Sequence, residues 1–434
     1  MIRERQLTAG PGGRILTNAN VWSADSQWLV YDTRSDASGS VFDGTRIECV
    51  HRQTGEVRIL YESRNGACCG VATWHPHEPR VIFILGPEQP TPDWSYSPCH
   101  RQGVIVDARR PGAAITLDAR DIVPPFTPGA LRGGSHVHIW HPLGDWVSFT
   151  YEDHVLESAQ ATNPAAERNR RTVAVAVPGH PVTVPKSSPR NHDGIAFSVV
   201  VAATTDHPRP GSDDLSRAFE DAWVGQRGYR RADGCWQTRA LAFFGDVTRL
   251  DGRKSTELFL LELPEDLTQP GLGPLEGTPT QMPFPPAGVL QRRLTGGEDD
   301  PDPGVHGPRH WPRSSPDGAK IGFLKRDPRG IVQFWMISPA GGPAQKISDH
   351  PFSVASAFTW HPNGRHVTYI GNQSICLTDT HTGDTRLLTQ PGGDPLQPEA
   401  CVFSPDGTAI AAIRRVRENG TEFNQIVIVE GIDI

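Results

Sequence analysis

A short motif made of an aromatic residue, a tight turn and an apolar strand recurs along nearly the whole of this chain. In its clearest copy, Phe403-Ser404-Pro405-Asp406-Gly407 precedes the apolar run from Ala409 to Ile413. Pro presets the first turn position, Asp bonds to its own backbone and Gly accepts a positive φ, so each copy predicts an antiparallel hairpin. The copies begin at Trp22, Trp74, Trp140, Asn191, Ser314, Trp360 and Phe403.

Two further strands follow most copies of the motif. After the copy at Trp360, strand-like segments occupy 374–379 and 385–389, separated by a turn at 382–384. Four antiparallel strands in each repeat are typical of a β-propeller blade. Repeated blades also explain how 434 residues with 44 Gly and 40 Pro can form one domain. We therefore predict an all-β fold, a single seven-bladed β-propeller over residues 1–434.

The two ends of the chain complement each other. The last repeat stops after its third strand, while Arg5-Gln6-Leu7-Thr8 has the same form as Arg386-Leu387-Leu388-Thr389, a fourth strand. We expect residues 3–9 to complete the last blade and close the ring, which would hide both sheet edges.

Two stretches interrupt the repeat. Residues 205–238 are predicted to be an insertion in blade 4, with a short helix over 213–223 because its apolar residues have helical spacing. Residues 264–289 are rich in Pro and Gly and are predicted to form a loop over one face.

The composition and charge indicate which classes of partner molecule the protein is not expected to bind. A net charge of -7 and a pI near 6.2 argue against nucleic acid. The sequence has no stretch with the length of a membrane-spanning helix and no apolar signal-peptide core at its start, so we expect no membrane partner and a cytoplasmic location.

The repeat also separates structural from functional candidates. His75, His141 and His361 share one turn position and are predicted to be structural. Residues four and two positions before the aromatic residue belong to the innermost strand, whose alternate side chains face one side. This count selects polar residues that occur in one blade only, namely Asn18, Asn20, His136, His138, His310 and Glu399, with His306, Arg309 and Gln397 nearby.

These residues suggest a metal site. His136 and His138 would place two imidazoles on one strand face, and His310, Gln397 or Glu399 could add ligands from other blades. Imidazole and carboxylate ligands suit Mn²⁺, Zn²⁺, Fe²⁺ or Ni²⁺, and Ca²⁺ is a further option. The alternative is that these histidines only form hydrogen bonds in a hydrated channel.

Several longer stretches resemble known families. The repeated turns are similar to those of TolB propellers, and Gly133–Leu156, Arg190–Gly194 and Arg209–Gly225 resemble the YidR-type TolB-like proteins of bacteria. More distantly, the chain resembles oligogalacturonate lyases, propellers that hold Mn²⁺ with three His and one Gln. That resemblance implies a manganese site at His136 and His138, although Gly133 stands where the family has its Gln.

The leading hypothesis is a metal-dependent carbohydrate lyase that cleaves an acidic oligosaccharide or glycoside by β-elimination. His192 or His154 is the predicted base, Arg309 the predicted anion clamp, and Asn18, Asn20, His306 and Arg168 are predicted to contact substrate. The alternatives are a non-catalytic TolB-like interaction scaffold and a metal-dependent glycoside hydrolase or epimerase. The oligomeric state is left open.

Overall fold

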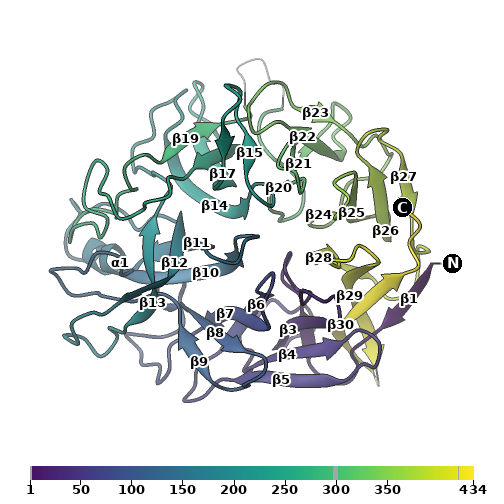
Figure 1. The fold of residues 1–434 in the computed structure, drawn as a ribbon, viewed down its shortest axis with the longest axis horizontal. Coiled ribbons are helices and arrows are strands. Elements are labelled where there is room, and N and C mark those ends of the chain that lie inside the picture. The colour runs from purple at the N-terminus through teal and green to yellow at the C-terminus, as the bar shows by residue number, and fades with distance from the viewer. Residues whose placement is uncertain (1, 297–301, 419) are drawn as a thin grey trace.

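Seven four-stranded antiparallel sheets are arranged as blades around a central axis (Figure 1). The computed structural model describes residues 2–296, 302–418 and 420–434. The chain is therefore a seven-bladed β-propeller, as the repeat predicts.

The blades follow the order of the sequence. Blade 1 contains β2 (Gly13–Ile15), β3 (Trp28–Arg34), β4 (Arg46–His51) and β5 (Val57–Glu62). Blade 2 contains β6 (Cys69–Trp74), β7 (Arg80–Leu85), β8 (Gln102–Asp107) and β9 (Ala114–Thr116). Blade 3 contains β10 (Gly133–Trp140), β11 (Val147–Asp153), β12 (Thr172–Val182) and β13 (Gly194–Val200).

The remaining blades have the same layout. Blade 4 contains β14 (Leu215–Trp223), β17 (Ala240–Thr248), β18 (Lys254–Glu262) and β19 (Leu290–Arg293). Blade 5 contains β20 (Arg313–Ser314), β21 (Ile321–Arg326), β22 (Val332–Ile337) and β23 (Gln345–Lys346). Blade 6 contains β24 (Thr359–Trp360), β25 (His366–Gly371), β26 (Ser374–Asp379) and β27 (Thr385–Leu387). Blade 7 contains β28 (Leu396–Phe403), β29 (Ala409–Glu418), β30 (Thr421–Glu430) and β1 (Arg3–Gln6).

Strand β1 is the outer strand of blade 7. It pairs antiparallel with β30, so that Arg3 lies opposite Glu430 and Gln6 opposite Val427. The Leu7 amide extends the pairing by donating to the Ile426 carbonyl at 2.8 Å. The two ends of the chain therefore share one sheet.

The helix predicted over 213–223 is wrong, because this segment is the innermost strand of blade 4. Strand β14 pairs with β17, and the register shifts between Phe219 and Ala222, where Glu220 has a φ of 55°. This bulge switches the side-chain alternation within the strand, so the apolar residues acquire spacings that resemble those of a helix.

The copy of the motif at Asn191 is also placed differently from the prediction. It precedes β13, the outer strand of blade 3, and Trp223 takes the aromatic position of blade 4. The stretch 205–238 thus holds β14 together with a hairpin of β15 (Tyr229–Arg230) and β16 (Trp236–Gln237). Helical turns in the described ranges are limited to α1 (His154–Gln160), between β11 and β12, and the 3-10 turn η1 (Pro98–His100).

The shared aromatic and histidine positions join neighbouring blades. Each of three motif histidines packs edge-on against the aromatic residue of the next blade, in the pairs His75–Trp140, His141–Trp223 and His361–Phe403. His75 and His361 also bond through Nε2 to the glycine carbonyl of the next blade's turn, at 3.0 and 3.2 Å. The prediction that these histidines are structural is confirmed.

The loop over 264–289 packs against blades 3 and 4. Leu267 and Leu275 are buried in the core between these blades. The buried guanidinium of Arg132 donates to the Gln281 carbonyl at 3.0 Å and to Asp153, which holds the loop to blade 3. None of the helices in the described ranges is long and apolar enough to span a membrane.

Candidate functional site

The innermost strand of blade 3 does not present its two histidines on one face. The register of β10 shifts between His136 and Ile139, where Val137 has a φ of 58°. His136 is half-buried, whereas His138 is fully buried beside the Phe149 ring. A β-carbon added to Gly103 of blade 2 would lie 2.6 Å from His138 Nε2, so His138 occupies the interface between blades 2 and 3.

The predicted ligands from other blades are engaged elsewhere. His310 is buried, and its Nδ1 lies 2.9 Å from the Pro308 carbonyl while Nε2 accepts the Leu324 amide at 3.1 Å. Gln397 accepts a hydrogen bond from Arg415 at 2.8 Å. Glu399 is half-buried, its Oε2 has no partner, and burial raises its pKa.

These side chains do not fit a metal site. Within residues 2–296, 302–418 and 420–434, no three His, Cys, Asp or Glu side chains are grouped so that they could hold a metal ion. His310 would have to give up two backbone hydrogen bonds, and the ring of His138 lies between blades 2 and 3, away from the other predicted ligands' partners. We therefore derive no chemical step through a metal.

His136 instead belongs to a histidine–arginine cluster, which comprises His136, Arg101, Arg171 and Arg309. Burial, followed by the charges of Arg101, Arg309 and Arg171, holds the pKa of His136 well below its usual value. Its Nδ1 is buried without a hydrogen-bond partner. The imidazole is consequently neutral at neutral pH and retains a lone pair that can accept a proton.

The three arginines differ in how their charge is balanced. Arg309 donates to both carboxylate oxygens of Glu220, at 2.7 and 3.2 Å, and Arg171 pairs with Glu152 at 2.6 Å. The half-buried Arg101 donates through Nε to the Tyr96 hydroxyl at 2.9 Å and has no carboxylate partner among the described residues. Its Nη1 is buried without an acceptor. Arg101 is therefore the group in this cluster that can take up an anion.

The predicted bases lie outside the cluster. His192 bonds through Nε2 to the Asp118 carbonyl at 3.1 Å, and burial lowers its pKa to about 3. His154 begins α1 and bonds to His100 at 3.0 Å, and burial lowers its pKa to about 4. Neither side chain is among the groups that perturb His136.

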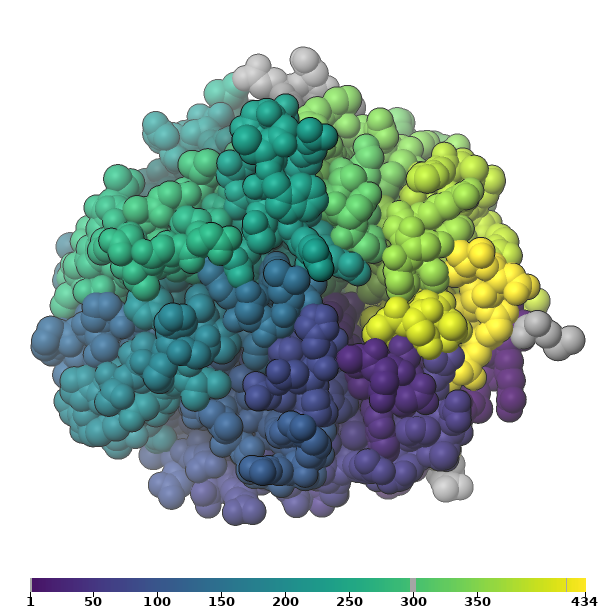
Figure 2. Space-filling model, viewed as in Figure 1, coloured from purple at the N-terminus to yellow at the C-terminus, as the bar shows by residue number. Residues whose placement is uncertain are grey.

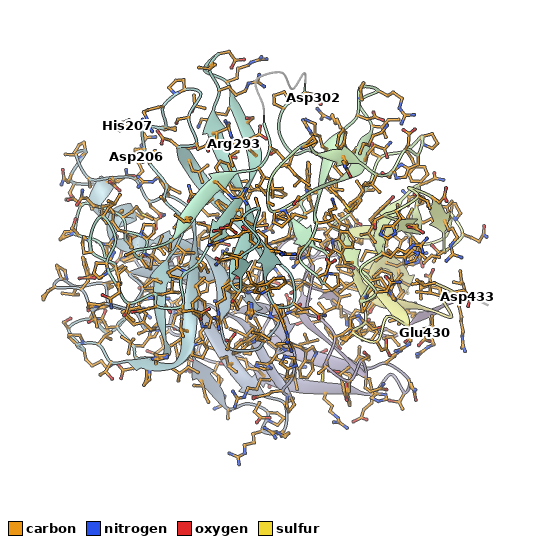
Figure 3. The ribbon with its side chains drawn as sticks, turned by 45° about the horizontal axis from the view of Figure 1, so that its top comes forward. Asp206, His207, Arg293, Asp302, Glu430 and Asp433 are labelled. Atoms are coloured by element: carbon orange, nitrogen blue, oxygen red, sulfur yellow. The ribbon has the colours of Figure 1, made fainter. Side chains whose placement is uncertain are left out.

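The predicted substrate contacts are dispersed. Asn18 accepts a hydrogen bond from Arg313, and Asn20 lines a central cavity. His306 lies 3.5 Å from Asp302. The exposed Arg168 bonds through its amide to Asp206, which lies at the outer edge of the disc (Figure 3).

Arg101 and Arg171 were missed by the sequence argument. Arg101 follows η1 and Arg171 directly precedes β12, so neither belongs to an innermost strand. Counting back from the aromatic position could not select these two arginines, because they lie in loops of blades 2 and 3. Their position relative to His136 depends on how those loops fold.

Comparison with known proteins identifies a matching family model, relatives in sequence and solved structures with a similar fold. A family model described as "Protein of unknown function (DUF3748)" matches residues 68–192. A solved structure titled "Oligogalacturonate lyase in complex with manganese" aligns with a TM-score of 0.54 at 11% identity, over 98% of this chain and 92% of that one. A putative TolB from Agrobacterium tumefaciens aligns with a TM-score of 0.40 at 14% identity, over 90% of this chain and 98% of that one.

One relative matches along almost its whole length. "Uncharacterized protein YidR" of Escherichia coli (strain K12) is 44% identical over 411 residues, which is 94% of each chain. At this identity and coverage the two proteins share one fold and one evolutionary origin. The chain belongs to the YidR family.

Proposed function

We propose that this propeller is a carbohydrate lyase that cleaves an acidic oligosaccharide or glycoside by β-elimination at the histidine–arginine cluster. The supporting observations are that the half-buried His136 keeps Nδ1 without a partner, that the charges of three arginines act on it, and that of these only Arg101 lacks a carboxylate partner in the described part of the chain. The fold shared with a structure titled as an oligogalacturonate lyase agrees with this proposal.

The proposed reaction assigns one task to each group. The substrate carboxylate pairs with Arg101, which withdraws charge and makes the neighbouring carbon acid easier to ionise. His136 takes the proton from that carbon, the electron pair forms a carbon–carbon double bond, and the bond to the leaving oxygen breaks. Water supplies the proton that the leaving oxygen gains, and the hydroxide that this leaves takes the proton back from His136. Arg171 and Arg309 remain paired with their glutamates and orient the site.

Substrate binding would also tune the base. Burial, followed by the charges of the three arginines, holds the pKa of His136 low in the free protein. A bound carboxylate compensates Arg101, which raises the basicity of His136 when the substrate is present. Binding and proton abstraction are thereby coupled through one electrostatic contact.

The test is the appearance of an ultraviolet-absorbing unsaturated uronate from acidic oligosaccharides. Wild-type protein should produce it, Arg101→Gln should raise KM more than it lowers kcat, and His136→Gln should lower kcat. Arg64→Gln, which changes an exposed arginine between blades 1 and 2, is the matched control. Products without a double bond would support a hydrolase, and no turnover across a broad panel would support an interaction scaffold.

A further inference from the structure

Arg101 is held by a neutral partner, unlike the other two arginines of the histidine–arginine cluster. Its Nε donates to the Tyr96 hydroxyl at 2.9 Å, whereas Arg171 and Arg309 are paired with glutamates. Burial raises the pKa of Tyr96, so its hydroxyl stays protonated at neutral pH. Tyr96 therefore orients the Arg101 guanidinium without cancelling its charge.

The Tyr96 ring belongs to a stack that begins in blade 1, here called the arginine–aromatic stack and made of Arg34, Phe42, Tyr96 and Arg101. The Arg34 guanidinium carbon lies 4.5 Å from the centroid of the Phe42 ring. The Phe42 and Tyr96 rings are stacked, with centroids 4.8 Å apart and planes at 11°. The Arg101 guanidinium carbon lies 5.1 Å from the centroid of the Tyr96 ring. Each guanidinium thus lies at one end of a pair of stacked rings, a favourable place for a cation.

The far end of the stack is fixed to blade 2. Arg34 Nε donates to Asp32 at 2.5 Å, and the same buried carboxyl group accepts the Val71 amide at 2.9 Å. Val71 has a φ of 59° where the register of β6 shifts between Gly70 and Thr73, so this contact uses the bulge of the innermost strand. A shift of Arg34 would break a buried hydrogen bond, so this end of the stack is held in place.

Two glycines make room for the stack beside His136. Gly70 holds the position in blade 2 that His136 has in blade 3, four residues before the aromatic residue of the motif. A β-carbon added to Gly70 would lie 2.8 Å from the Phe42 ring. One added to Gly134 of β10 would lie 2.9 Å from the Arg101 amide nitrogen. Blades 1 to 3 follow one another around the disc, from purple to teal in Figure 2, so the stack crosses blade 2 and reaches the strand that carries His136.

We propose that the arginine–aromatic stack fixes the orientation in which the Arg101 guanidinium receives the substrate carboxylate, which makes Tyr96 a positioning residue of this site. Nε is bonded to Tyr96 and Nη1 is buried, so Nη2 is the nitrogen left for the carboxylate. A guanidinium that is already held loses less side-chain freedom when it binds an anion. The identity of the anion rests on the proposed function, whereas the fixing of Arg101 can be measured without turnover.

The first measurement needs no substrate. Full-length protein is treated with phenylglyoxal, which modifies arginine side chains, and the modified peptides are quantified by mass spectrometry. Tyr96→Phe removes the acceptor of Arg101 Nε and keeps the ring. We therefore expect Arg101 to react about tenfold faster than in wild type, the effect of losing one hydrogen bond to a charged group. The exposed Arg326 is the internal reference and should react at the same rate in both proteins.

Tyr61→Phe is the matched control, because it removes the hydroxyl of a buried tyrosine that packs on Phe83 in the core between blades 1 and 2. Arg101 should react in this variant as it does in wild type. An unchanged rate for Arg101 in Tyr96→Phe would overturn the proposal, and so would an equal acceleration in Tyr61→Phe.

The second measurement uses trigalacturonate as the substrate and follows the unsaturated product by its ultraviolet absorbance. If wild type forms this product, Tyr96→Phe should raise KM about tenfold and change kcat by less than about twofold. An unchanged KM would overturn the role of Tyr96. If wild type forms no product, the proposed function fails for this sugar, while the rate of Arg101 modification still decides whether Tyr96 fixes the guanidinium. The two failures are therefore distinguishable.

Discussion

The imidazole of His141 in blade 3 packs edge-on against the indole of Trp223 in blade 4, with ring centroids 4.7 Å apart and planes at 88°. The same contact joins blade 2 to blade 3 through His75 and Trp140, at 4.6 Å. Blade 4 therefore has the same contact as blade 3, although the residues before Trp223 do not show the motif in the sequence. Among the described residues, this contact joins three pairs of neighbouring blades, the third through His361 and Phe403.

Replacing Trp223 by Leu should destabilise the protein by about 2–4 kcal/mol. The substitution removes a buried aromatic ring and the hydrogen bond to the Ile139 carbonyl. Urea unfolding followed by circular dichroism measures the change. Trp236→Leu at a 55% exposed site is the control and should cost less than about 1 kcal/mol. An equal loss of stability in the two variants would show that the contact of Trp223 with the neighbouring blade does not contribute to stability.

The sequence predicts the number of blades and the structural histidines because those features repeat. A turn residue that recurs in several units has the same physical task in each of them. The prediction of a helix over 213–223 was wrong because the bulge in this strand depends on the backbone conformation at Glu220. Glutamate occurs in helices as well as in strands, so this residue type does not reveal the bulge. The cluster at His136 was found only in part because Arg101 and Arg171 reach it from loops.

Replacing Gly103 by Ala should destabilise the interface between blades 2 and 3 by about 1–3 kcal/mol. The new methyl group would lie 2.6 Å from His138 Nε2 and 2.8 Å from Asp118 Oδ1, closer than packing allows. Thermal unfolding of Gly103→Ala, His138→Ala and the double variant forms the test. If the clash is the cause, the Gly103→Ala penalty shrinks in the His138→Ala background. A penalty of unchanged size would contradict this account.

Asp221 should make the protein less stable as the pH rises. Burial raises its pKa from 3.8 to about 7, even though Arg313 acts in the opposite direction. Between these values the folded carboxyl holds a proton that the unfolded one has lost, so the free energy of unfolding falls with increasing pH, by up to about 4 kcal/mol. Asp221→Asn should therefore be more stable than wild type at pH 8, with the gain vanishing near pH 4. Exposed Asp433→Asn should show no such crossover in urea melts at the two pH values.

Replacing His310 by Ala should lower stability by about 1–3 kcal/mol and leave the metal content unchanged. The substitution leaves the Leu324 amide without its acceptor in a buried site. Elemental analysis of purified wild type and variant, combined with urea unfolding, separates a structural histidine from a ligand. Loss of a stoichiometric metal together with the side chain would instead restore the metal hypothesis drawn from the sequence.

The pH dependence of the proposed reaction should place its acid limb below pH 6.5. His136 must be neutral to act as a base, and its lowered pKa keeps it neutral further into the acidic range. Removing one of the cations that lower this pKa should raise it, so Arg101→Gln should shift the acid limb of kcat/KM to higher pH while Arg64→Gln leaves it in place. The profile is measured with an excess of acidic oligosaccharide over protein at constant ionic strength. An unshifted limb in Arg101→Gln would mean that a group other than His136 takes the proton.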